Sequence, residues 1–260
     1  MNLTAQVLSS LCDPTTYESL ALSEKSQELV TPSGRRYPIV SDVPLLLEAA
    51  DAVGLNDRYQ TLYDRLAPLY DLAIGTFALF RSGGLEKRRR EYLDELEIRP
   101  GARVLEVSVG TGQNLRFLPP SATYDGLDIS MGMLRRCQRN LRRWNRQAFL
   151  VQGAAEHLPF VDGPFDSVLH MGGINFFNDK AQALREMVRV AKPRTKIVVF
   201  DETEKITRKY EKRPLAGSFY TDQHSSATAP VDYLPPGMRE TQVKTIAGGD
   251  LYCLTFRTPD

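Results

Sequence analysis

The chain between residues 103 and 202 alternates between short apolar runs and longer amphipathic stretches. Runs rich in β-branched and other apolar residues predict strands at 103–109, 123–129, 147–153, 165–171 and 196–202. The stretches between them predict helices at 112–118, 130–144 and 179–191, and a turn or short helix at 155–160. Strands joined by helical crossovers form a parallel sheet with helices on both faces, so the pattern indicates an α/β fold.

Two further strands, "RETQVKTIA" and "LYCLTFRT", meet at Gly248 and Gly249 near the C-terminus. A glycine pair at such a junction is typical of a tight connection between antiparallel strands. We therefore expect a mostly parallel, doubly wound sheet that ends in an antiparallel hairpin.

The residues outside this alternation predict three additional segments. Residues 1–50 contain short β-rich runs separated by Pro and Gly, which predicts a small appendage before a main domain at 51–260. Leucines at three- and four-residue spacing predict lid helices within 56–98, with a kink at Pro68. Residues 205–237 have weak periodicity and predict an insertion or lid.

Composition narrows the class of protein. The 260 residues are 42% hydrophobic and 25% charged, as in soluble globular proteins, and no apolar stretch approaches the ~20 residues that cross a bilayer. The net charge of +1 provides no overall field for nucleic acid, although basic runs at 86–92 and 134–146 form either solvated helix faces or phosphate contacts. Three dispersed cysteines and no signal peptide predict a reducing, cytoplasmic location without disulfides.

Polar and small residues follow the predicted strands at the edge where an open parallel sheet binds ligands. Glu106 precedes a turn containing Gly110 and Gly112, and Asp128 ends the next strand, 22 residues after Glu106. Glycine permits close backbone approach, and the amino end of a following helix would suit an anionic group. Asp128 can accept two hydrogen bonds from a ribose diol, or it can cap its helix, although Ser130 is better placed for capping.

This arrangement resembles motifs I and II of class I S-adenosylmethionine (SAM)-dependent methyltransferases, in particular the UbiE-like, type 11 branch. Their motif E/D-h-G-x-G-x-G is matched by Glu106, Gly110 and Gly112, while Ser108 replaces the first glycine. Serine is small enough to stand there if its φ is ordinary. A dinucleotide-binding oxidoreductase would need a third glycine where Leu115 stands, so that alternative is weaker.

The resemblance extends over residues 103–202 and implies a Rossmann-like methyltransferase fold with SAM as cofactor and S-adenosylhomocysteine as product. Ala154 replaces the family's adenine-binding Asp, for which Glu156 is the candidate substitute, and Arg194 replaces a glycine. The cofactor-binding residues that the resemblance implies are Tyr63, Tyr70, Glu106, Val107, Ser108, Gly110, Gly112, Asn114, Asp128, Ile129, Met133, Ala154, Ala155, Glu156 and His170.

The tail "YPIVSDVPLLL" of the appendage resembles the Trm112-like or zinc-ribbon-like segments that precede some methyltransferase domains. Only Cys12 remains of the possible metal ligands, with Thr15, Thr31 and Ser33 near the other positions. A structural zinc site needs four Cys or His ligands. We therefore expect no metal here, and a module used for packing, for a partner or for a homodimer.

Methyl transfer from SAM is an in-line displacement, so a base is needed only for a weakly acidic nucleophile. His170 is the candidate base, or else a core histidine; Asp201 and Glu202 are further candidates. The expected acceptor is a small, partly apolar molecule that contacts Phe176, Phe177 and Tyr220, although the two phenylalanines are equally compatible with the core.

Two other functions remain open at this point. "HMGGIN" stands where the amino-methyltransferase signature (N/D)-P-P-(Y/F) would follow the fourth strand, which argues against DNA. A methyltransferase of tRNA or protein is one alternative. A catalytically silent SAM-binding partner subunit is the other, and Ser108 and Ala154 motivate it.

Overall fold

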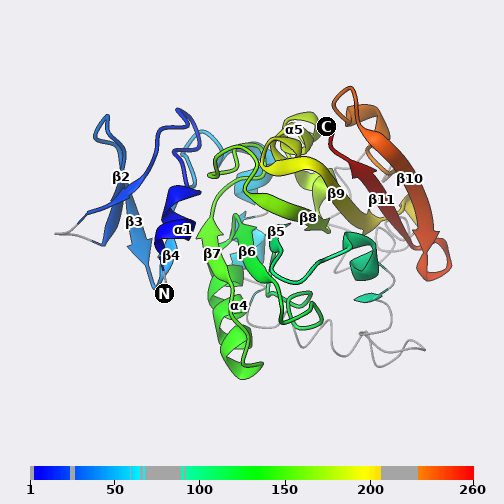
Figure 1. The fold of residues 1–260 in the computed structure, drawn as a ribbon, viewed down its shortest axis with the longest axis horizontal. Coiled ribbons are helices and arrows are strands. Elements are labelled where there is room, and N and C mark those ends of the chain that lie inside the picture. Colours follow the sequence, from blue (N-terminus) through cyan, green and yellow to red (C-terminus); the bar gives the residue numbers. More distant parts are fainter. Residues whose placement is uncertain are drawn as a thin grey trace.

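The structure, a computed structural model, describes residues 3–23, 27–58, 60–64, 67, 89–90, 92–205 and 228–260, except for the side chain of Phe176. Two sheets account for the strands in these ranges. Figure 1 shows a small N-terminal sheet beside a larger sheet, with the C-terminal hairpin at the far edge.

The larger sheet has seven strands in the order β10-β11-β9-β8-β5-β6-β7. Their bounds are β5 Arg103–Val107, β6 Thr123–Asp128, β7 Phe149–Gln152, β8 Phe165–Met171, β9 Ala191–Glu202, β10 Arg239–Ile246 and β11 Leu251–Arg257. Strands β5 to β9 pair in parallel, whereas β11 is antiparallel to both β9 and β10. This confirms the predicted mostly parallel sheet with an antiparallel hairpin, and the strand order reverses at β5, between β6 and β8.

Helices α4 (Met131–Arg143) and α5 (Lys180–Arg189) cover opposite faces of the larger sheet (Figure 1). Each begins at a side-chain cap: Ser130 Oγ accepts from the amide of Met133, and Asp179 Oδ1 accepts from the amide of Gln182. A cap of this kind satisfies one of the amides that a helix start leaves free. The predicted capping role of Ser130 is therefore confirmed.

The predicted helix at 112–118 is absent. This segment forms successive turns, in which the amide of Leu115 bonds to Gly112 O and the amide of Phe117 bonds to Asn114 O. Pro119 follows directly and disfavours helical backbone at Leu118. The expectation of a helix dipole aimed at the glycine turn was therefore wrong, because residues 112–118 form turns and not a helix.

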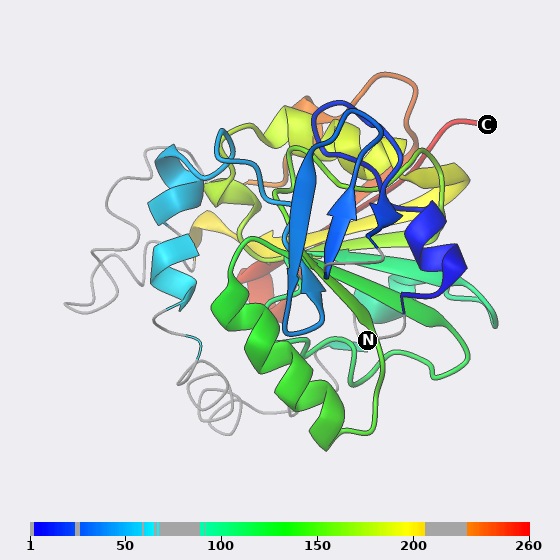
Figure 2. The ribbon, with the colours of Figure 1, turned by 90° about the vertical axis from the view of Figure 1, so that its left-hand side faces the viewer.

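Apolar residues of the N-terminal sheet belong to the same hydrophobic core as those of the larger sheet. The N-terminal sheet contains β1 (Ala21–Leu22), β2 (Glu28–Val30), β3 (Arg36–Val40) and β4 (Val43–Pro44), and follows α1 (Ala5–Ser9). Leu45 forms a parallel bridge with Gln152 of β7, and Leu11 forms an antiparallel bridge with Phe160. Figure 2 views the molecule from the side of this sheet. The contacts mean that the N-terminal segment covers the β7 edge and shares one hydrophobic core with the larger sheet.

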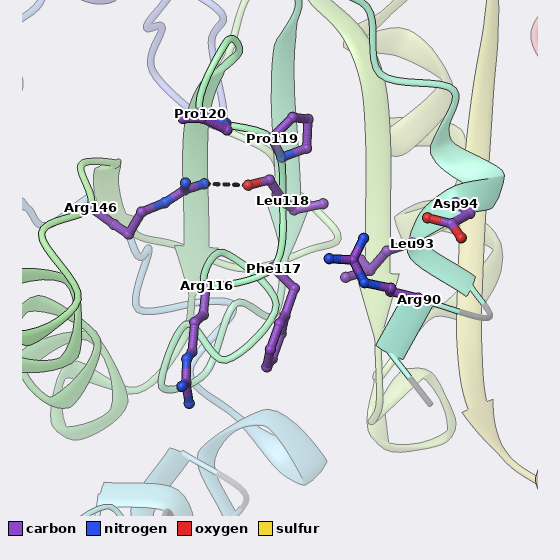
Figure 3. Close-up of a pocket in the computed structure, with 9 residues that line it drawn as sticks. All are labelled: Arg90, Leu93, Asp94, Arg116, Phe117, Leu118, Pro119, Pro120 and Arg146. Atoms are coloured by element: carbon purple, nitrogen blue, oxygen red, sulfur yellow. Dashed lines mark hydrogen bonds between the residues drawn. The ribbon is translucent and has the colours of Figure 1, made fainter. Parts of the chain in front are cut away.

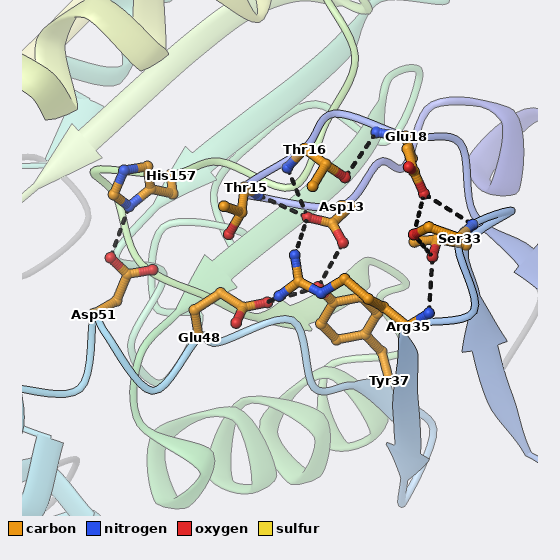
Figure 4. Close-up of polar contacts among 11 residues, drawn as sticks. Asp13, Thr15, Thr16, Glu18, Ser33, Arg35, Tyr37, Glu48, Asp51 and His157 are labelled. Carbon is orange, nitrogen blue, oxygen red and sulfur yellow. Dashed lines mark hydrogen bonds and ion pairs between the residues drawn. The ribbon is translucent and has the colours of Figure 1, made fainter.

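A buried carboxylate holds the N-terminal segment together (Figure 4). Asp13 Oδ1 accepts from the amide of Thr15 at 2.8 Å and from Arg35 Nη1 at 3.0 Å, and its Oδ2 accepts from the Tyr37 hydroxyl at 2.8 Å. These hydrogen bonds hold the pKa of Asp13 below its usual value although burial acts in the opposite direction. The network links the loop after Cys12 to β3; the likeness to Trm112 stays a prediction.

Short helical turns complete the described chain: η1 (Asp94–Leu96), η2 (Ile174–Phe176), η3 (Val231–Tyr233) and η4 (Ala247–Gly249). Residues 54–58 and 60–64 are helical, in the region where a lid helix was expected. All three cysteines are buried and free of disulfides, as predicted. Within the described ranges no helix is both long enough and apolar enough to span a bilayer.

Candidate functional site

The turn after β5 has the left-handed backbone that glycine favours, although Ser108 stands at its first glycine position. Ser108, Gly110 and Gly112 have φ values of 60°, 54° and 75°. This left-handed region strains every residue with a β-carbon. The condition under which serine was expected to replace glycine, an ordinary φ, is therefore not met. Arg194, at the other lost glycine, has φ 58°.

Gly112 is required for a second reason, because the turn packs directly on α4. A β-carbon at Gly112 would lie 2.5 Å from Cys137 Sγ. No real β-carbon contact is that short, so a larger residue would push the turn away from α4. Gly112 thus fixes the distance between the turn and the helix that follows β6.

Asp128, at the end of β6, joins this turn to α4. Its Oδ2 accepts from the amide of Gly110 at 2.7 Å, and its Oδ1 accepts from the amide of Ser130 at 2.9 Å. Burial raises the pKa of Asp128 to about 6, while the two amides act against this rise. Each carboxylate oxygen has a second lone pair, so the predicted ribose contact remains compatible with these bonds.

Glu106 is buried beneath the turn. Its Oε1 accepts from Asn114 Nδ2 at 2.6 Å, whereas its Oε2 has no hydrogen-bond partner among the described residues. Burial raises the pKa of Glu106 to about 8. A buried carboxyl with one unsatisfied oxygen is costly unless a donor from a ligand completes it. Glu106 is therefore suited to a cationic or amino group.

Arg89 and Tyr92 are neighbours of this carboxyl that the sequence analysis did not single out. The Tyr92 hydroxyl lies 2.7 Å from Asn114 Oδ1, and Arg89 Nη1 donates to the same oxygen. Arg89 is only 5% exposed, although the basic run 86–92 was read as a solvated face or a phosphate contact. The only available signal was the Arg-to-Tyr spacing of three residues, which places both on one side of a helix.

The loop after β7 brings Ala154, Ala155 and Glu156 to the neighbouring strand end, and all three are buried. Glu156 Oε1 accepts from the amide of Asn178 at 2.9 Å and from Asn56 Nδ2 at 3.3 Å. The Glu156 carboxylate thus ties the helical residues 54–58 of the lid region to the segment before α5. Its role toward adenine stays a prediction. Ile129 is half-buried beside Asp128, and Met133 is buried in α4.

His170 is fully buried at the end of β8. Its Nδ1 lies 3.2 Å from Val107 O, and because a carbonyl only accepts, Nδ1 carries the hydrogen. Its Nε2 is an acceptor without a hydrogen-bond partner among the described residues, and its ring stands edge-on to Phe177 with centroids 5.1 Å apart. Burial lowers the pKa of His170 to about 4, so the ring is neutral near pH 7. It can accept a proton but cannot donate one from Nε2.

Asp201, at the end of β9, organises the loop that follows β8. Its Oδ2 accepts from the amides of Gly173 and Ile174 at 3.2 and 3.1 Å. Burial raises the pKa of Asp201 to about 6. These amide contacts give Asp201 a positioning role in the structure, and a direct role as a base stays a prediction, as it does for Glu202.

The lid helix reaches the start of α4 through Asp64. Asp64 Oδ1 accepts from Ser130 Oγ at 2.5 Å and from the amide of Gly132 at 2.7 Å. Tyr63 precedes Asp64 and is half-buried. The predicted contacts of Tyr70 and Tyr220 lie outside the described residues, and so does the side chain of Phe176.

Comparisons with known proteins agree with this geometry. Residues 105–199 match the family described as "Methyltransferase domain". The chain is 33% identical over 144 residues to the demethylmenaquinone methyltransferase of Renibacterium salmoninarum, which covers 55% of this chain and 58% of that protein. It is 29% identical over 154 residues to the ubiquinone/menaquinone biosynthesis C-methyltransferase UbiE of Geotalea daltonii, covering 56% and 63%. The chain thus spans about three fifths of the length of these relatives.

Among solved structures, the [4+2]-cyclase SpnF is similar with a TM-score of 0.63 and 17% identity, over 78% of this chain and 96% of that one. At this identity the likeness concerns the fold alone, and a shared fold does not decide the reaction. The strand order, the glycine turn and the matched family agree with one another. Residues 105–199 are therefore similar in sequence to the methyltransferase-domain family, and the sheet that contains them has the fold of class I SAM-dependent methyltransferases.

Proposed function

We propose that the chain transfers the methyl group of SAM to a small, partly apolar acceptor of the quinone type named by its relatives. The observation that carries the proposal is the pair of buried carboxyl groups at the strand-order reversal, Glu106 with a free Oε2 and Asp128 beside Gly110. An ammonium would satisfy Glu106 Oε2, and a ribose diol would donate to Asp128. The donors of SAM thus fit the acceptors that these residues present.

SAM, when bound, supplies an electrophilic methyl group on a sulfonium, and displacement of that group requires alignment of the acceptor in line with it. The protein's part is to bind and orient. Asp128 and Glu106 would fix the two ends of the cofactor, and the Asp64 contact would hold Tyr63 near the same site. Neutral His170 has a free Nε2 that could take a proton from an acidic acceptor, which keeps it the candidate base.

The first test is calorimetric titration with SAM and with S-adenosylhomocysteine. We expect micromolar binding of both, and a loss of at least about tenfold in Asp128→Asn, because the uncharged amide is a weaker acceptor. Transfer is then measured with radiolabelled SAM and demethylmenaquinol as acceptor. The absence of binding would contradict the cofactor assignment, and binding without methylation of demethylmenaquinol would contradict the acceptor assignment.

The catalytically silent alternative makes a different prediction in the same assay. Strained Ser108 and the missing Asp at Ala154 favour it, since both weaken the family pattern. That alternative predicts binding of SAM with no transfer to any of a panel of phenols, quinols and amines. A transfer rate that falls in His170→Leu while the affinity for SAM is unchanged would exclude it.

A further inference from the structure

A cavity of about 510 Å³ lies between the segment before η1 and the loop before β6. Three guanidinium groups, one carboxylate and several apolar side chains line it. The lining residues that define it are Arg90, Asp94, Arg116, Phe117, Leu118 and Arg146, with Leu93 and two prolines beside them. The volume falls in the ordinary range for small-molecule sites.

The guanidinium group of Arg146 is held in place before any ligand arrives. Arg146 Nη2 donates to Leu118 O at 2.6 Å, and the group lies 5.8 Å from the centroid of the Tyr124 ring. Figure 3 shows Arg146 and Arg90 reaching toward the Leu118 loop from opposite sides. Because these contacts fix its rotamer, Arg146 loses little side-chain entropy on binding.

Arg116 is fixed by aromatic rings rather than by a carboxylate. Its guanidinium lies 5.4 Å from the Phe117 ring centroid and 5.9 Å from that of Trp144. Among the described residues neither Arg116 nor Arg146 forms an ion pair. Stacked guanidinium groups keep their N–H donors available, and their planar fork matches the oxygens of a phosphate.

The surroundings of the cavity are positively charged although the whole chain is nearly neutral. Helix α4 carries five arginines in thirteen residues and no acidic residue. The acidic side chains between Gly110 and Ala155 are Asp125 and Asp128, and both are buried. Asp125 is moreover paired with Arg103. This face therefore attracts anions, and among the described residues that line the cavity Asp94 is the one carboxylate.

We propose that this cavity binds a phosphate ester whose organic part is apolar, with the phosphate on Arg146, the organic part against Phe117, and Arg116 adding positive charge to the same cavity wall. The cavity is separate from the strand-end site, because the turns at 112–118 lie between it and Glu106. The proposal therefore does not depend on the proposed methyl transfer. The phosphate ester could be a soluble metabolite or the headgroup of an anionic lipid, since both present the same chemistry.

The test uses phenyl phosphate as a soluble probe, followed by calorimetry, and vesicles of phosphatidylcholine with and without phosphatidylglycerol, followed by sedimentation. The variants are Arg116→Gln and Arg146→Gln. Arg142→Gln is the matched control, because it removes the same charge from an exposed position of α4 that does not line the cavity. Binding of S-adenosylhomocysteine is measured alongside to report on the strand-end site.

We expect each cavity variant to weaken binding of one probe at least about tenfold, and the control to change it less than about twofold. Loss with phenyl phosphate identifies a soluble ester, and loss with the anionic vesicles alone identifies a lipid headgroup. Equal weakening in Arg142→Gln, or no saturable binding of either probe, would overturn the proposal. Should Arg146→Gln fail to fold, Arg116→Gln decides, since that guanidinium makes no hydrogen bond to the described protein.

Discussion

Asp64 and Gly132 are packed so closely that the glycine has no room for a side chain. The amide of Gly132 donates to Asp64 Oδ1 at 2.7 Å, and a β-carbon on Gly132 would lie 2.9 Å from Asp64 Cα. An amide in the first turn of α4 is thus satisfied by a residue 68 positions earlier in the chain. The contact fastens the lid helix to the helix that follows the candidate ribose carboxylate.

We expect Gly132→Ala to separate the lid helix from α4 and to weaken SAM binding by roughly fivefold to tenfold, which corresponds to the loss of about one hydrogen bond. Calorimetry with SAM measures this, and hydrogen exchange of residues 54–64 should rise in the same variant. Asp64→Asn should have a smaller effect in the same direction. Asp57→Asn, on the exposed side of the same helix, is the control; an equal loss there would attribute the effect to charge alone.

Ser108→Gly should stabilise the protein. Serine at φ 60° is strained by about 1 kcal/mol relative to glycine, and this exceeds the small entropic advantage of serine in the unfolded chain. The measurement is the midpoint of denaturant unfolding. Ser121→Gly is the control, because Ser121 is exposed and has an ordinary φ, and this change should destabilise by a few tenths of a kcal/mol. A destabilised Ser108→Gly would mean that the hydroxyl compensates the strain.

Glu106 should make stability depend on pH. Burial raises its pKa from the ordinary 4.5 to about 8, so between these values the folded state binds more protons than the unfolded state. The free energy of unfolding therefore falls as pH rises through this window, by at most about 1.4 kcal/mol per pH unit from this group. In Glu106→Gln, which can still accept from Asn114, that contribution should vanish while SAM binding weakens.

Thermal unfolding from pH 5 to 9 checks this difference between wild type and variant. His170 acts at lower pH, because its depressed pKa of about 4 makes stability fall only as pH drops below its ordinary 6.5. The two windows overlap between pH 4.5 and 6.5 and have opposite slopes there, so the contribution of Glu106 is measured above pH 6.5, where His170 no longer contributes. Identical slopes for wild type and Glu106→Gln above pH 7 would show that Glu106 is not protonated in the folded protein.

Asp13→Ala should loosen the N-terminal sheet. The change removes one of the two carboxylates to which Tyr37 and the half-exposed Arg35 both donate, and leaves only Glu48, at a cost of about 1 kcal/mol. Limited proteolysis should then cleave near residues 31–36 sooner than in wild type. Glu28→Ala, which removes the surface ion pair with Arg36, is the comparison variant and should change little. Equal protection of all three proteins would contradict the role given to Asp13.

The features that could be predicted from sequence are those that depend on local pattern. Each strand of the larger sheet, the cap Ser130 and the terminal hairpin follow from apolar runs and flanking residues. The turn at 112–118 was mistaken for a helix because its amphipathic pattern is real. Two features oppose a helix there: the side chain of Asn114 donates a hydrogen bond to the buried Glu106, and Pro119 follows the segment directly.

The remaining errors and omissions concern contacts across long separations. Arg89 lies in a run that looks solvated, and its burial depends on Asn114, 25 positions later. The left-handed backbone of Ser108 and Arg194 is set by the turn and strand around them rather than by the residues themselves. Such positions resemble ordinary polar residues in a sequence, and the structure is needed to identify their strain.

Because Leu45 pairs with Gln152, we expect that the chain cannot be truncated at the predicted boundary near residue 50 without exposing β7. A protein trimmed to begin at residue 51 would lose the cover of β7 and leave that strand's backbone donors and acceptors unpaired at an open edge. It would also lose Leu11, Leu29 and Leu46 from a core that they share with Phe160. Engineers seeking a minimal version of this protein should therefore treat the first fifty residues as indispensable to solubility.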